Sequence, residues 1–181
     1  MLETIKKRKT CFCFSGKKVS DKKIKLILEA GRYAPSSHNS QDWKFIVVKD
    51  KKKIEEIVCN CTYGLFHHCP PIIIALVAEP IYAKDKKGLL KKNLLEKAQY
   101  HKYLNIGALT AHMVLMAESL GINTAILSTT IKETNKLLHV PKKSEAVICI
   151  ALGYEDKKFS IPKEARKELK EIVRYEKYNG R

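Results

Sequence analysis

The sequence predicts a single α+β domain. A chain of 181 residues is long enough for one domain with a sizeable hydrophobic core. Its apolar residues follow helical spacing in some segments and form short continuous runs, typical of buried strands, in others. The helical segments between these runs differ in length, which favours an α+β order over a regular series of βαβ units. We therefore expect residues 1–181 to form one domain.

The N-terminal half contains alternating helix and strand signals. Ser20 is a candidate N-cap, and Ile24, Ile27 and Leu28 follow it at helical spacing. Pro35 ends this helix, because proline fixes φ and has no N–H to donate. The elements expected in this half are helices over Leu2 to Lys9, Ser20 to Pro35 and Lys51 to Val58, and a strand over Lys44 to Val48.

The C-terminal half is dominated by one long helix, expected from about Leu94 to Leu120 and closed by Gly121. This segment is apolar around most of its circumference, so we expect it to be buried on several sides or within a subunit interface. The other expectations are strands at Ile72 to Ala78, Asn123 to Ser128 and Glu145 to Leu152, a helix at Lys132 to His139, a helical tail at Lys163 to Tyr175, and irregular connectors at Cys59 to Pro71 and Ile81 to Lys92.

The net charge of +16 has two interpretations. Most lysines are interleaved with acidic residues along predicted helices, which is typical of a solvated surface. The alternative is attraction of phosphate-bearing ligands or nucleic acid. The aromatic residues are not interleaved with the basic ones, as stacking platforms for nucleic acid would require. The charge alone leaves both interpretations open.

The six cysteines do not form a recognisable zinc or disulfide pattern. Five metal-competent residues gather in one segment, but without the usual ligand spacing: Cys59, Cys61, His67, His68 and Cys69. The N-terminus lacks the apolar region of a signal peptide, and no apolar run approaches the roughly 20 residues of a membrane span. We therefore expect a cytoplasmic protein with free thiols.

The segment Ala34 to Trp43 is the strongest candidate for a binding loop. It joins a predicted helix to a predicted strand and offers hydroxyls, carboxamides and backbone N–H groups. Binding residues often lie on loops that rigid elements hold on both sides. A capped turn has the same composition, so both readings stand. The common motifs for dinucleotides, phosphate loops, serine nucleophiles and zinc helices are absent, so difficult chemistry would require a cofactor.

These segments resemble the nitroreductase family of FMN-dependent oxidoreductases. Family members typically read R-R-S-x-R near the N-terminus, then a helix, then A-P-S-x-x-N-x-Q-P-W and an apolar strand. The corresponding segments here run from Arg8 to Phe12 and from Ala34 to Trp43. Further landmarks match in the same order along nearly the whole chain: Tyr103 to Gly107, Leu120-Gly121, Ala151 to Tyr154 and Arg166 to Leu169.

The resemblance implies a mostly antiparallel central sheet flanked by helices, in an intertwined homodimer with the flavin at the interface. It also implies a ping-pong reaction, in which NAD(P)H delivers hydride to flavin N5 and a small electron acceptor, such as a nitroaromatic or a quinone, then takes its place. No catalytic side chain, no specific nucleic acid and no membrane is implied. Two alternatives to this function remain. One is the same FMN-binding fold with another reaction, such as dehalogenation or amide oxidation, and the other is a basic nucleic-acid-binding domain.

The resemblance also assigns site residues by position. It assigns the binding of the phosphate and ribityl end of FMN to Arg8, Lys9, Thr10 and Arg166. Phe12 lies at the position where a second arginine is usual. The loop of Pro35, Ser36, Ser37 and Asn39 is expected to reach the flavin of the partner subunit, with Gln41 ordering the loop. The stretch Ile126-Leu127-Ser128-Thr129 is expected against the ring, with the Ser128 N–H near N5. His101 is expected beside the ring.

Two departures from the family pattern bear on the affinity for FMN. Phe12 removes one cation, so we expect the phosphate clamp either to be weaker or to be completed by another cation, such as Lys9 or Lys17. Asp42 replaces the usual proline, and we expect this change to loosen the turn before Trp43.

Overall fold

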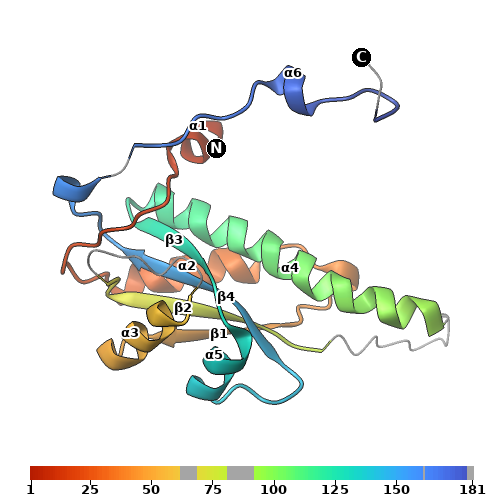
Figure 1. Cartoon of the computed structure of the whole chain (residues 1–181), viewed down its shortest axis with the longest axis horizontal. Helices are drawn as coiled ribbons and strands as arrows, with labels where there is room; N and C mark the ends of the chain where they lie inside the picture. The colour runs from red at the N-terminus through yellow and green to blue at the C-terminus, as the bar shows by residue number, and fades with distance from the viewer. Residues whose placement is uncertain (62–68, 81–91, 161, 179–181) are drawn as a thin grey trace.

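The computed structural model describes residues 1–61, 69–80, 92–160 and 162–178, with the side chains of residues 92–99 left aside. Within these ranges the centre of the molecule is a four-stranded antiparallel sheet in the order β1-β2-β4-β3 (Figure 1). The strands are β1 (Trp43–Val48), β2 (Ile72–Ala78), β3 (Asn123–Ser128) and β4 (Glu145–Gly153). The α+β class and the antiparallel sheet are thereby confirmed.

The central strand β2 is buried along its whole length, as its uninterrupted apolar run predicts. Side chains alternate between the two faces of a strand, so β2 contributes to a core on each side of the sheet. Ile72, Ile74 and Leu76 join one core, and Ile73 and Ala75 join the other. This two-sided burial explains why β2 lies between β1 and β4.

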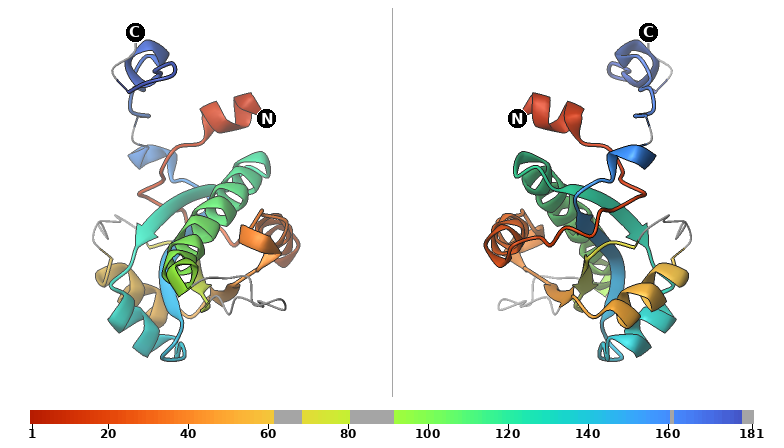
Figure 2. Two further views of the ribbon diagram at one scale, coloured as in Figure 1. Left: turned by 90° about the vertical axis from the view of Figure 1, so that its right-hand side faces the viewer. Right: turned by 90° about the vertical axis from the view of Figure 1, so that its left-hand side faces the viewer.

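Helices cover both faces of the sheet (Figures 1 and 2). The first core packs against α2 (Asp21–Arg32) and α4 (Lys92–Ser119), and the second packs against α3 (Lys51–Cys59) and α5 (Ile131–Leu137). Asp50 caps α3 by accepting a hydrogen bond from the Lys53 N–H. Between α2 and β1 lies a short 3₁₀ turn, η1 (Ser37–Asn39).

The long helix α4 is buried on one side and apolar but exposed on another. Ile106, Leu109 and Met113 point into the core, whereas Tyr100 and Leu104 are 72% and 68% exposed. The expectation of burial on several sides therefore does not hold within one chain. Gly121 follows the helix with a positive φ of 69°, a conformation that glycine adopts without strain and that ends the helix as predicted.

The tail departs from the sequence prediction. In place of a helix over residues 163–175, the chain continues from η2 (Lys157–Phe159) in an extended form and makes one helical turn, α6 (Leu169–Ile172). All residues from 163 to 172 are exposed. A short helix without a packing partner is only marginally stable in water, so local helix propensity does not suffice here. Both views of Figure 2 show the tail and α1 (Leu2–Lys7) projecting on the same side of the body.

None of the described helices combines the length and the apolar character needed to cross a membrane. Two predicted connectors lie largely outside the described residues, at 62–68 and 81–91.

Candidate functional site

The N-terminal segment is joined to the edge of the sheet by backbone contacts. Thr10 forms a parallel bridge with Thr124 at the start of β3, and the Cys11 N–H donates to the Thr124 carbonyl at 2.9 Å. Phe14 pairs with Glu155 just after β4. This pairing fixes residues 8–12 beside the start of the edge strand.

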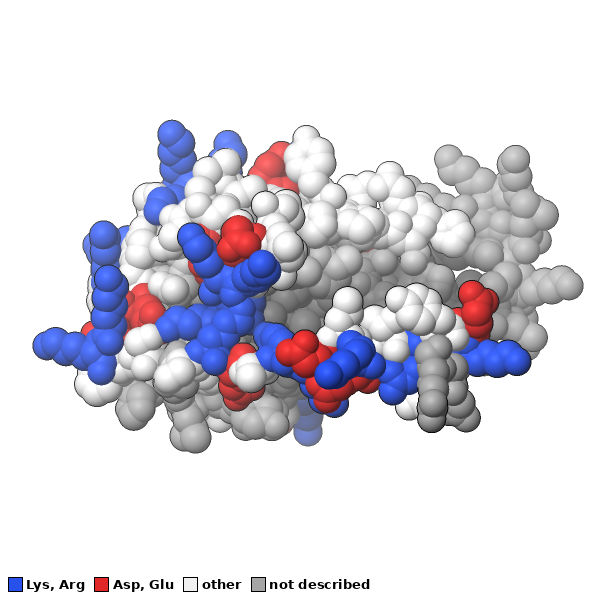
Figure 3. Space-filling model, turned by 90° about the horizontal axis from the view of Figure 1, so that it is seen from above, with Lys and Arg blue, Asp and Glu red and all other residues white. Residues whose placement is uncertain are grey.

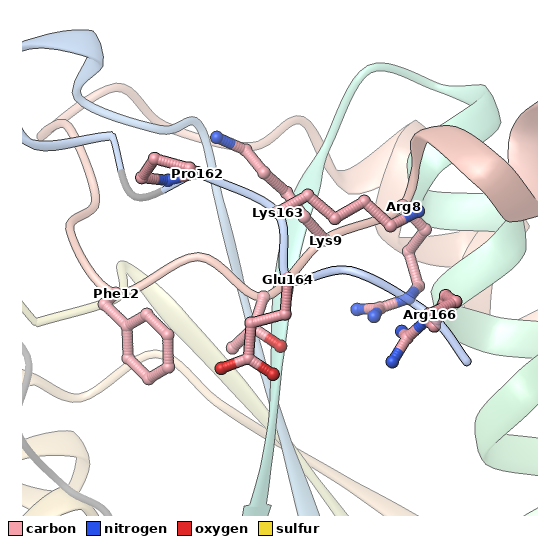
Figure 4. A pocket seen from close by; sticks show the side chains of 8 residues that line it. Arg8, Lys9, Phe12, Pro162, Lys163, Glu164 and Arg166 are labelled. Carbon is pink, nitrogen blue, oxygen red and sulfur yellow. The ribbon is translucent and has the colours of Figure 1, made fainter. Parts of the chain in front are cut away.

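Residues 8–12 and the tail form the walls of one pocket of about 140 Å³ (Figure 4). Figure 4 shows the guanidinium groups of Arg8 and Arg166 at one end and the ring of Phe12 at the other. The residues that line the pocket are Arg8, Lys9, Thr10, Phe12, Pro162, Lys163, Glu164 and Arg166. The structure thus brings together all five residues that the sequence assigned to the phosphate end.

The charges of this pocket are unequally available to a ligand. Among the described residues neither the Arg8 nor the Arg166 guanidinium has a hydrogen-bond or ion-pair partner. The Lys9 ammonium lies 2.8 Å from a carboxylate oxygen of Glu155 and donates to the Ser160 hydroxyl at 2.5 Å. The Lys163 ammonium donates to a carbonyl of α1, that of Lys6. Two guanidinium groups are therefore the cations open to an anion.

Of the two lysines considered for the position that Phe12 leaves without a cation, Lys9 lines the pocket and is paired with Glu155, and Lys17 lies over the Tyr154 ring, 4.7 Å from its centroid. The expectation that one of them completes the clamp stays a prediction. The Cys11 thiol beside the pocket is buried, and this burial raises its pKa to about 11, so it adds no charge.

The loop between α2 and β1 has an unusual backbone. His38, Asn39 and Gln41 have φ values of 54°, 53° and 48°. Residues other than glycine rarely occupy this region, and such conformations are found where the surrounding contacts enforce them. Inside the loop, the Gln41 side chain donates to Asn39 Oδ1 at 3.1 Å and the Gln41 N–H donates to Ser36 Oγ at 3.1 Å. Gln41 thus makes its contacts within the loop.

A buried side chain of α4 holds the same loop. Asn105, 4% exposed, accepts from the Ser37 N–H at 3.0 Å and donates to Asp42 Oδ1 at 2.7 Å. Asp42 also accepts from the Ser40 hydroxyl at 2.6 Å. Asp42 is therefore buried and bonded, which corrects the expectation that it loosens the turn. Asn105 was noted in the sequence only as a family landmark, because nothing in a sequence shows which backbone group it meets.

Of the residues expected against the flavin ring, those from Ile126 to Ser128 lie on the edge strand β3, Thr129 follows it, and His101 lies on α4. In β3, Ile126 is 46% exposed, whereas the Leu127 side chain is buried in the core on the α3 side. Ser128, at the end of the strand, is exposed. His101 lies half-buried on α4. The apolar side chain open to a ligand is therefore Ile126, and Leu127 offers only its backbone there.

The cysteine and histidine segment shows no metal site within the described ranges. Cys59 and Cys69 are exposed and Cys61 is buried, all as free thiols, while His67 and His68 lie outside the described residues. Three pocket residues were missed by sequence reasoning: Pro162, Lys163 and Glu164. Their nearness to Arg166 in sequence was the only available signal.

Comparison with known proteins finds similar sequences. Residues 5–61 match the model of the nitroreductase family. A relative from Archaeoglobus fulgidus, provisionally named an NADH dehydrogenase/NAD(P)H nitroreductase, is 28% identical over 159 residues, which cover 84% of each chain. The iodotyrosine deiodinase of Thermotoga neapolitana is 24% identical, over 97% of each chain.

Solved structures match nearly the whole chain. B. megaterium NfrA2 superposes with a TM-score of 0.85 at 21% identity, covering 98% of this chain and 74% of that one. A nitroreductase family protein from Streptococcus pneumoniae gives a TM-score of 0.79 at 24% identity, covering 95% and 98%. The chain therefore has the nitroreductase fold. These matches confirm the resemblance to the nitroreductase family and support an oxidoreductase enzyme. The cytoplasmic location stays a prediction.

Proposed function

We propose that this protein is an FMN-dependent oxidoreductase that uses NAD(P)H to reduce a small conjugated acceptor. One observation carries the proposal: Arg8, Thr10 and Arg166, from opposite ends of the chain, line a single pocket. A phosphate dianion is best held by fixed guanidinium groups and a hydroxyl, which donate charge-assisted hydrogen bonds. Both guanidinium groups lack a partner within the described part of the chain, so their charge is available to such a ligand.

The edge strand supports the placement of the rest of the cofactor. Thr10 meets β3 at Thr124, and Ser128 lies four residues further along the strand. At about 3.3 Å per residue, this separation is roughly 13 Å. A ribityl chain followed by a ring system is an extended group suited to that span. Ile126 offers it an exposed apolar side chain between the two ends.

FMN supplies the two-electron chemistry when it is bound, by accepting a hydride from reduced nicotinamide and passing electrons to the acceptor. The chain's own residues bind and orient it. Arg8 and Arg166 hold the phosphate by charge, and Thr10 adds a hydroxyl. The exposed backbone of Ser128 offers a donor beside the ring, and Ile126 covers apolar surface. This division of roles needs no acid, base or nucleophile from the chain.

We also propose that the loop of residues 34–43 serves the site of a second copy. Asn105, which holds the loop, lies 14 residues before the end of α4 at Ser119, about 21 Å of helix. The pocket lies beyond that end, where Thr10 meets Thr124. In Figure 1 the connection between α2 and β1 lies away from the segment that follows α1 and from the tail, which carry the residues that line the pocket. One chain alone therefore does not bring the loop to its own pocket.

Exposed apolar side chains support such a homodimer. They lie on α4 and on the two projecting terminal segments: Tyr100, Leu104, Leu2, Ile5, Leu169 and Ile172, each between 47% and 72% exposed. These side chains are available to an interface with a second copy. An intertwined dimer in which the tail and α1 lie against a second copy covers these side chains.

The class of acceptor is best resolved by assay. Nitroaromatics and quinones follow from the named nitroreductase relatives, and reductive dehalogenation of an aromatic ring follows from the deiodinase relative. A panel of one nitroaromatic, one quinone and one halogenated phenol, each with NADH and NADPH, ranks them by kcat/KM.

Titration with flavins tests the proposed cofactor. Isothermal titration calorimetry measures the Kd for each flavin. We expect saturable binding of FMN, and binding of riboflavin, which lacks the phosphate, weakened by about 10- to 100-fold, the effect of losing about 1.5–3 kcal/mol. Equal affinities for the two flavins contradict the assignment of the pocket. Salt-dependent binding of generic DNA without uptake of FMN would favour a nucleic-acid-binding protein instead.

The positive charge does not by itself favour nucleic acid. Figure 3 shows Lys and Arg side chains interspersed with Asp and Glu over the face that carries α1 and the tail. Lys6–Glu3 is an exposed ion pair within α1, and Lys49–Asp21 is a further exposed ion pair elsewhere on the protein.

A further inference from the structure

We propose that Asp42 and Asn105 form a positioning pair that sets the conformation of the loop and, through it, the affinity for FMN. The proposal rests on the proposed function. It concerns residues that do not touch the phosphate pocket, and it gives a role to the position where the chain departs from the family pattern. Asp42 is 6% exposed and Asn105 is 4% exposed, so both side chains lie inside the protein.

The direction of each hydrogen bond determines how the pair acts. A carboxylate can only accept, so Asp42 Oδ1 receives the Nδ2 donor of Asn105 at 2.7 Å. This bond turns the other end of the Asn105 amide, its Oδ1, toward the Ser37 N–H at 3.0 Å. Asp42 therefore selects one of the two amide orientations. In the opposite orientation the amide nitrogen would face the Ser37 N–H, and both groups would be donors.

The backbone conformation of the loop gives this selection a consequence. The three left-handed residues 38, 39 and 41 lie between Ser37, which Asn105 holds, and Asp42, which Asn105 also contacts. Residues other than glycine adopt this conformation at an energetic cost and keep it only where the surrounding structure enforces it. Asn105 thus bridges the two ends of the strained turn. Without that bridge, relaxed conformations compete, and a ligand must supply the ordering energy when it binds.

A proline at position 42 could not do this, because its side chain has no acceptor. The hydrogen-bonding capacity of Asp42 is only partly used. Its second oxygen, Oδ2, is buried and has no hydrogen-bond partner among the described residues. A buried, half-satisfied carboxylate carries a desolvation cost. Such a cost is typical of a residue retained for the conformation it selects.

The test exchanges the donor and the acceptor. Asn105→Asp places two carboxylates in contact, and we expect it to raise the Kd for FMN by at least about tenfold, measured by calorimetry. Asp42→Asn combined with Asn105→Asp restores one donor and one acceptor. The amide introduced at position 42 can donate to the carboxylate introduced at position 105, and that carboxylate still accepts from the Ser37 N–H. We expect the double variant to return to within about threefold of the original Kd.

Two further measurements separate positioning from general stability. Trp43 directly follows Asp42 and is 6% exposed, so its emission reports on the turn without any flavin. We expect a red shift in Asn105→Asp and its reversal in the double variant. Lys44→Ala, which removes only an exposed ion pair to Glu79, serves as a control with unchanged Kd and emission.

The outcomes are distinguishable. If the original protein binds FMN and Asn105→Asp binds it equally well, the positioning role is overturned while the proposed function stands. If the double variant matches the single variant in Kd, the pair does not act through donor and acceptor identity, and the proposal is again overturned. A native protein that binds no FMN overturns both proposals.

Discussion

Arg8 and Arg166 lie in the same pocket although they come from opposite ends of the chain. Neither guanidinium has a hydrogen-bond or ion-pair partner within the described residues, whereas the two lysines of the pocket are held by Glu155 and by the Lys6 carbonyl. Two guanidinium groups are thus open to a ligand, whereas the two lysines contact other groups of the protein.

Replacing either arginine should weaken FMN binding. Arg8→Ala and Arg166→Ala each remove charge-assisted contacts worth about 1.5–3 kcal/mol, which corresponds to a 10- to 100-fold rise in Kd. Arg174→Ala is the matched control, because Arg174 lies on the same tail and donates only to tail carbonyls such as that of Val173. Calorimetric titration with FMN measures all three. An unchanged Kd in both pocket variants would show that these arginines do not hold the phosphate.

A methyl group at Gly153 should destabilise the protein. A Cβ there would lie 2.6 Å from the Phe14 ring and 2.8 Å from the Pro71 ring. Neither ring can retreat without moving its backbone, so we expect Gly153→Ala to lower the free energy of unfolding by about 1–3 kcal/mol. The variant should also shift the N-terminal segment that carries the pocket residues.

Denaturant unfolding measures the cost, with Gly16→Ala as the control because nothing lies within 4 Å of a Cβ at Gly16. Equal stability of Gly153→Ala and the original protein would show that this contact is absent.

The stability of the protein should depend on Glu145 at low pH. The Tyr103 hydroxyl donates to Glu145 at 2.6 Å and the Lys102 ammonium lies 3.2 Å away, so the pKa of Glu145 is lowered, the Tyr103 hydrogen bond being the largest cause. A lowered folded-state pKa gives stability that is present above the ordinary value and is lost as the pH falls through the folded value. Tyr103→Phe should cost about 1.5 kcal/mol at neutral pH and less in acid.

Urea unfolding between about pH 7 and 3 measures this dependence against Glu145→Gln, which cannot titrate. The original protein should lose stability more steeply than this variant below the ordinary glutamate pKa of 4.5. Parallel curves would contradict the role of Glu145.

The cysteines should separate into two reactivity classes. Cys59 and Cys69 are exposed, whereas Cys11, Cys61 and Cys149 are buried and burial raises the pKa of each thiol, to about 11 for Cys11 and Cys61. The thiolate is the reactive form, so the buried thiols should resist alkylation until the protein unfolds. Mass spectrometry of native and denatured samples identifies the labelled sites. Rapid native labelling of Cys61 would contradict the packing of α3 on the sheet.

The strands were predictable because their signals are local. The continuous apolar run of β2 and the bounds of β3 follow directly from residue types, and both appear in the structure as predicted. The tail was predicted wrongly for the converse reason. Its helix propensity is local, but its stability depends on a packing surface that a single chain does not offer it.

The pocket was predictable only by resemblance. No spacing rule connects Arg8 with Arg166, and it is the family pattern that puts them together. Residue chemistry alone does not reveal that Lys9 forms an ion pair with Glu155, nor that Asn105 accepts a hydrogen bond from the Ser37 N–H. These contacts arise from the register of strands and helices far apart in the sequence.

The absorbance of the FMN-loaded protein under anaerobic conditions, with reduced nicotinamide added, tests the central claim most directly. The account predicts that NADH or NADPH bleaches the visible absorbance of the bound flavin, that a quinone or a nitroaromatic restores it, and that Arg8→Ala lowers the amount of flavin bleached. A protein that stays colourless after incubation with FMN, or a bound flavin that neither nicotinamide reduces, would contradict it.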